Sequence, residues 1–179
     1  MSNLSSAYAD ALFEIALEEN IPQEILAQSA VISQAVKEND DFARLLAAPM
    51  ITKEEKTEFV DKIFGGSINK NLLNFMKVMI QRKDAAILAE SFEQYEKLYN
   101  KHFNIEKAVA VTAVPMSREL QAKLTEKLEK VTGKTIVLTN KVDENCLGGV
   151  ILQFSDMQIN DSIAQKLETL KNQLKNINR

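Results

Sequence analysis

The string Thr132-Gly133-Lys134-Thr135 is the stretch of the sequence that most resembles a site for chemistry, because Gly-Lys-Thr ends the phosphate-binding P-loop. The full motif needs a glycine five positions before the Gly of Gly-Lys-Thr, and Leu128 stands there. A P-loop also follows a strand and begins a helix, whereas this string follows a helical pattern and begins a β-rich one. We therefore interpret Gly133 as the end of a helix and not as part of a nucleotide site.

Cys146 and His102 are the single cysteine and the single histidine of the chain. One residue of each type cannot form an internal disulfide or a structural zinc site. Nucleophilic catalysis by Cys146 would need His102 as its base, yet the spacing of His102 fits a packed residue on an apolar helix face. Carboxylate pairs such as Glu54-Glu55 are adjacent residues, which do not face each other on a helix. We predict no catalytic residue, no cofactor and no metal.

Residues 1–105 have the apolar spacing of helices throughout. Thr52 followed by Glu55 is a capping box, which predicts a helix beginning after Thr52. The low content of 5 Gly and 3 Pro also favours long regular elements. Five breaks divide this region and predict a six-helix bundle: 20–22, 39–41, 49–52, 65–67 and 83–84.

Residues 106–179 have a different pattern, which predicts a small α+β domain. In chain order we predict a strand at 109–113, a helix between Ser117 and Gly133, strands at 135–142, 150–154 and 157–159 with a hairpin turn at 155–156, and a last helix that begins near Asn160 or Asp161 and reaches Ile177. The apolar residues of this last helix either close the domain or contact a partner. The fold class is thus mainly α, with domains at 1–105 and 106–179.

Charge and hydropathy exclude several classes of protein. Residues 1–105 hold 11 Lys+Arg and 16 Asp+Glu, giving −5, whereas residues 106–179 hold 11 and 9, giving +2. The acidic first part argues against an RNA-binding module and favours no nucleic-acid partner. No apolar run approaches the ~18 residues of a membrane span. The amino terminus lacks the layout of a secretory signal or a transit peptide, so we expect a complete, cytosolic, bacterial-type protein.

Two predicted helices have more apolar surface than one stripe requires. In 4–17 and again in 68–80, a narrow polar stripe is the only interruption of the apolar side chains. Either both helices are central in the bundle, or one face of each lines a groove for the amphipathic helix of a partner. The pattern alone leaves both interpretations open.

Four motifs together resemble a known family. They are Tyr-Ala-Asp-Ala-Leu-Phe at 8–13, Pro-Met-Ile followed by Lys-Glu-Glu-Lys at 49–56, the helix at 72–82, and Val-Asp-Glu-Asn-Cys-Leu-Gly-Gly-Val at 142–150 with Ile-Asn-Asp-Ser at 159–162. In this order and spacing they are similar to the δ subunit of bacterial F-type ATP synthase, the homologue of the mitochondrial oligomycin-sensitivity-conferring protein. The resemblance covers essentially the whole length.

The resemblance implies a non-catalytic stator subunit, which links the catalytic head to the peripheral stalk so that rotor torque from proton flux drives ATP synthesis. It implies that residues 1–105 bind the N-terminal helices of the head's α subunits and that residues 106–179 contact the b subunits of the stalk. One copy per complex would lie peripherally at the cytoplasmic face of the bacterial plasma membrane. The residues expected in an α-tail groove between the first and fifth helices are Tyr8, Ala11, Leu12, Ile15, Leu72, Phe75, Met76 and Met79.

Two alternatives come from other classes of protein. One is a small helical adaptor or an RNA-binding module unrelated to ATP synthase. The other is a small enzyme, for which His102 and Cys146 are the distinctive candidates.

Overall fold

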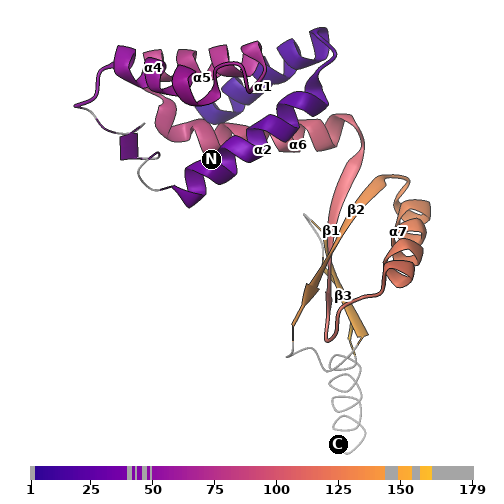
Figure 1. The fold of residues 1–179 in the computed structure, drawn as a ribbon. Coiled ribbons are helices and arrows are strands. Elements are labelled where there is room, and N and C mark those ends of the chain that lie inside the picture. The colour runs from indigo at the N-terminus through magenta and orange to yellow at the C-terminus, as the bar shows by residue number, and fades with distance from the viewer. Residues whose placement is uncertain are drawn as a thin grey trace, which may run out of the picture. The chain divides into compact units, whose positions relative to one another are not determined.

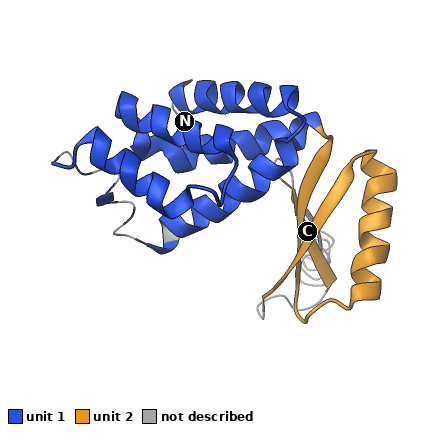
Figure 2. Ribbon diagram, turned by 45° about the horizontal axis from the view of Figure 1, so that its top comes forward, with its two compact units in different colours: residues 1–102 blue, residues 103–179 orange. Residues whose placement is uncertain are grey.

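The chain divides into two compact units, residues 1–102 and 103–179, as Figure 2 shows by colour. The structure, a computed structural model, describes residues 3–39, 42, 44–45, 48, 50–143, 149–154 and 158–162. The change of pattern in the sequence lies close to this division, at residue 105. Each unit has its own secondary structure, helical in the first and mixed in the second.

The regular elements described in the first unit are helices (Figure 1). Its elements are α1 (Asn3–Glu18), α2 (Pro22–Glu38), α4 (Lys53–Phe64), α5 (Lys70–Arg82), the 3-10 helix η1 (Ala85–Ile87) and α6 (Leu88–His102). The prediction of a mainly helical protein is confirmed. The count of six helices stays a prediction, since part of the stretch between α2 and α4 lies outside the described residues.

The ends of α4 and α5 are fixed by side-chain caps. Thr52 Oγ1 accepts a hydrogen bond from the Glu55 N–H at 3.2 Å, and the Thr52 N–H donates to Glu55 Oε2 at 2.9 Å. This confirms the predicted capping box, and the bond from the Thr52 backbone is the main reason why the pKa of Glu55 is lowered. Asn69 Oδ1 accepts from the Asn71 N–H at 2.9 Å and begins α5. The caps therefore fix the residues at which α4 and α5 begin.

The core of the first unit is formed by buried residues of α1, α2, α4, α5 and α6. Tyr95 of α6 belongs to this core and is fully buried. Its hydroxyl donates to the Pro22 carbonyl at 3.0 Å, which satisfies a polar group that water cannot reach. The ring of Phe13 packs against Tyr95 edge to face, with centroids 5.5 Å apart. These contacts tie α1 and the start of α2 to α6.

The buried phenol predicts a loss of stability at alkaline pH. Burial raises the pKa of Tyr95 above its ordinary value of 10, and the charge of Tyr99 adds to the shift. The folded state therefore favours the neutral phenol. Its contribution to the free energy of unfolding is complete below about pH 10, and above that pH it falls by about 1.4 kcal/mol for each pH unit. The difference in unfolding free energy between wild type and Tyr95→Phe should shrink between about pH 8 and about pH 11 in urea titrations. A constant difference would contradict the assignment.

The second unit contains a sheet with the strand order β2-β1-β3-β4. β1 (Ile105–Thr112) pairs in parallel with β2 (Thr135–Val142), and α7 (Arg118–Thr132) forms the crossover between them. β3 (Gly149–Phe154) and β4 (Gln158–Ser162) follow with antiparallel pairing. The strand predicted at 135–142 is confirmed, whereas β1 begins four residues earlier than the predicted 109 because it pairs along the full length of β2.

Gly133 ends α7 with a φ of 69°, in the left-handed region that favours glycine. The prediction that the Gly-Lys-Thr string ends a helix is thereby confirmed. Asn104, which itself has a φ of 55°, is held against this turn. Its side chain donates to the Gly133 carbonyl at 3.1 Å, and its carbonyl accepts from the Thr135 N–H at 3.1 Å.

The predicted start of the last helix at Asn160 or Asp161 is wrong. Both residues lie in β4, where they pair with Ile151 and Val150 of β3. Asn and Asp favour helix caps in local sequence, but here pairing with an apolar strand decides their conformation. The predicted turn at 155–156, Cys146 and the helix predicted to reach Ile177 lie outside the described residues.

Candidate partner-binding groove

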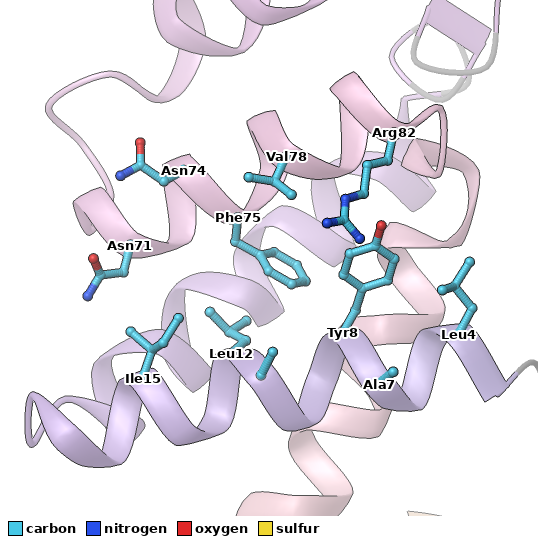
Figure 3. A pocket seen from close by; sticks show the side chains of 11 residues that line it. Leu4, Ala7, Tyr8, Leu12, Ile15, Asn71, Asn74, Phe75, Val78 and Arg82 are labelled. Atoms are coloured by element: carbon cyan, nitrogen blue, oxygen red, sulfur yellow. The ribbon is translucent and has the colours of Figure 1, made fainter.

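An apolar groove lies between α1 and α5, with a volume of about 460 Å³. The two helices run antiparallel, so that Leu4 and Arg82 lie at one end of the groove and Ile15 and Asn71 at the other (Figure 3). The lining residues recur at steps of three and four, which places them on one face of each helix. They are Leu4, Ala7, Tyr8, Ala11, Leu12 and Ile15 of α1, and Asn71, Asn74, Phe75, Val78 and Arg82 of α5.

Tyr8 forms part of the groove floor and is held on two sides. Its hydroxyl donates to Asp84 Oδ2 at 2.7 Å, and its ring packs edge to face against Phe75 with centroids 5.9 Å apart. Burial and the bond to Asp84 raise the pKa of Tyr8, while Arg82 acts in the opposite direction. The hydrogen bond and the ring contact together hold the phenol of Tyr8 in place in the groove floor.

Five of the eight residues predicted for a groove line it: Tyr8, Ala11, Leu12, Ile15 and Phe75. Their binding of a partner stays a prediction. The other three, Leu72, Met76 and Met79, do not line the groove: they are 0%, 1% and 0% exposed and belong to the core of the first unit. With 3.6 residues per turn, these three share the face of α5 that packs inward, and Phe75 and Val78 lie on the next face.

The sequence reasoning missed six lining residues: Leu4, Ala7, Asn71, Asn74, Val78 and Arg82. Asn71, Val78 and Arg82 stand four, three and seven positions from Phe75, so a helical stripe drawn through Phe75 contains them. The signal was present, but choosing this stripe required knowledge of which face meets the core.

Asn71 carries a polar group that the folded protein leaves unsatisfied. Its Nδ2 is buried and has no hydrogen-bond partner among the described residues. Such a group costs about 1–3 kcal/mol, so Asn71→Leu is expected to raise the free energy of unfolding by about 1 kcal/mol. Asn69→Leu, two residues away, removes the N-cap of α5 and should lower the free energy of unfolding by about 1 kcal/mol. Chemical denaturation of both variants checks the opposite signs, and a loss in both would show that the Asn71 amide is satisfied.

The structure describes one of the two residues considered for catalysis, His102. The ring of His102 lies edge to face against Phe13 with centroids 5.4 Å apart at the end of α6, although the residue as a whole is exposed and not buried in the core. In the part of the chain that the structure describes, no group of three or more His, Cys, Asp or Glu side chains could hold a metal ion. No helix within the described ranges is long and apolar enough to cross a membrane.

Residues 4–174 match the family model described as "ATP synthase delta (OSCP) subunit". The chain belongs to this family. The delta subunit of Alkaliphilus oremlandii is 34% identical, over 97% of this chain and 97% of that protein. The delta subunit of Clostridioides difficile is 30% identical with the same coverage of both chains. The membership confirms the resemblance and removes the alternative of a module unrelated to ATP synthase.

The fold of the delta (OSCP) family is also found among solved structures. A chain of the Toxoplasma gondii mitochondrial ATP synthase hexamer has a TM-score of 0.73 and 19% identity, with coverage of 97% of this chain and 98% of that one. As a delta subunit, the protein is a stator component of F-type ATP synthase. It is a structural part of a membrane-bound complex and is not itself catalytic.

Proposed function

We propose that the groove between α1 and α5 binds the N-terminal helices of the α subunits of the catalytic head. The observation that carries this proposal is an apolar groove with large side chains left open to solvent. Leu4, Ile15 and Val78 are 45%, 43% and 43% exposed although they line one concave surface. Apolar side chains gathered in this way mark a site where a partner completes the packing. An amphipathic helix fits such a groove.

The expected energies allow tight binding. Each large apolar side chain of the partner that becomes buried contributes about 1.5–3 kcal/mol. Ordering a flexible segment into a helix costs about 2–5 kcal/mol. Four such anchors therefore outweigh the ordering cost. Tyr8 and Phe75 already pack against each other in the free protein, so the floor of the site needs little rearrangement.

The second unit, by this proposal, contacts the b subunits of the peripheral stalk. A single copy then joins head to stalk on the cytoplasmic face of the bacterial plasma membrane. Proton flux turns the rotor, and its torque reaches the catalytic sites only if the head is held still. The division of the chain into a helical unit and a sheet-containing unit supports two separate attachments, one to each partner.

Titration of the full chain with a peptide of the α-subunit N-terminal tail tests the groove. Submicromolar binding, with NMR shifts at the methyl groups of Leu4, Ile15 and Val78, would support it. The methyl groups of Ile25 and Ile32, both fully buried in the core, serve as reference signals. No binding at high micromolar peptide by a folded protein, or shifts only outside α1 and α5, would overturn the proposal.

A further inference from the structure

The two walls of the groove carry opposite charges. α1 contains acidic residues and no Lys or Arg, and α5 contains basic residues and no Asp or Glu. The acidic ones are Asp10, Glu14 and Glu18, and the basic ones are Lys70, Lys77 and Arg82. We propose that this polarity fixes the direction in which the partner helix lies in the groove. The inference rests on the proposed function of the groove and adds the charge pattern of its partner.

The carboxylates of α1 form a row along the outer rim of the groove. All three are exposed. Each comes three residues after a lining residue, and residues three apart are neighbours on a helix surface. The pairs are Ala7 with Asp10, Ala11 with Glu14, and Ile15 with Glu18. A helix bound in the groove therefore has a negative edge beside it over about two turns.

The positive charge of α5 lies toward its two ends. Arg82 itself lines the groove, beside Tyr8 (Figure 3). Lys70 is exposed and stands four residues before the lining residue Asn74. Lys77, between them, forms an ion pair with Asp61 Oδ1 at 2.6 Å, which offsets its charge. The α5 edge thus carries positive charge at each end of the groove, and at the Arg82 end the Asp84 carboxylate that accepts from Tyr8 offsets part of it.

These edges define the chemistry of the partner. The lining of α5 extends from Asn71 to Arg82, a rise of about 16 Å, which matches three turns of an amphipathic helix. One flank of that helix carries Lys or Arg and lies over α1, and the other carries Asp or Glu and lies over α5. Turning the helix end for end exchanges its flanks, which would place like charges opposite each other on both sides.

Two designed peptides test the inference with the full-length protein. They share the same apolar residues and helix length, and their basic and acidic flanks are exchanged. Each carries a paramagnetic tag at its amino end, whose line broadening falls steeply with distance. We expect the tag of one peptide to broaden the methyl signals of Leu4, and the tag of the other to broaden those of Ile15. If both peptides broaden the methyl signals at the same end of the groove, the inference is overturned.

Charge variants give a second measurement. Glu14→Gln and Lys70→Gln should each weaken binding about threefold at low salt and reduce the preference for one direction. Lys97→Gln is the matched control, because Lys97 is an exposed residue of α6 that does not line the groove. It should change neither the affinity nor the preferred direction. The differences should decrease at physiological salt, where screening acts over about 8 Å. If neither the α-tail peptide nor the designed peptides bind, the groove function fails; if they bind without a preferred direction, only this inference fails.

Discussion

Leu72→Ala is expected to lower the free energy of unfolding by about 2–5 kcal/mol, one of the two largest effects we predict. Leu72 is 0% exposed and lies among the core residues of the first unit. The substitution removes buried methyl groups and leaves a cavity, because the surrounding helices relax only in part. Urea denaturation followed by the helical circular dichroism signal measures the loss, since the helical first unit provides most of that signal.

Leu4→Ala provides the matched control for this prediction. It is the same substitution in a neighbouring helix, at a residue that is 45% exposed and lines the groove. The loss of stability should be below about 1 kcal/mol, because the Leu4 side chain buries less apolar surface than that of Leu72 and its truncation removes less of it from the core. Equal losses in the two variants would show that Leu72 is not a core residue.

Val78→Asp is expected to reduce the affinity for the α-subunit tail at least 100-fold, which corresponds to about 2.8 kcal/mol. Val78 is 43% exposed at the groove, so the new carboxylate stays solvated in the free protein and the fold is kept. Once a helix covers the groove, the carboxylate loses its water against apolar side chains, and pairing with Arg82 four residues away offsets only part of that cost. Isothermal titration calorimetry of variant and wild type gives the ratio.

Val31→Asp separates an effect on the groove from a general effect of charge. Val31 lies on α2, is 68% exposed and does not line the groove. The substitution Val31→Asp adds the same charge to the same acidic unit. The affinity for the α-subunit tail should stay within about twofold of the wild-type value. Equal affinities of the folded Val78→Asp and Val31→Asp variants would place the α-tail site elsewhere.

The helical first part, the capping box and the strand at 135–142 could be predicted because local signals determine them. Thr52 and Glu55 satisfy each other's neighbouring backbone groups, so their pattern works without help from the rest of the fold. Gly133 is similar, since its left-handed conformation is a local property of a helix end. These features depend on residues that are close in the sequence.

Other features depend on contacts that local sequence does not contain. Leu72 and Phe75 are both large apolar residues of one helix, and only the packing of α5 on the core separates the buried one from the groove residue. Asn160 has the composition of a helix cap, but its register opposite Ile151 makes it a strand residue. Arg82 was missed because a charged residue does not fit an apolar pattern, although its long side chain reaches the groove.

The connection between the two units has a mechanical consequence for a stator. α6 ends at His102 and β1 begins at Ile105, so two residues join them, and Asn104 is already bonded to the turn at Gly133. Two residues extend to about 7 Å at most. A long flexible linker would act as an entropic spring that lengthens before it carries load. Here a pull on one unit passes to the other through covalent bonds with almost no slack to take up.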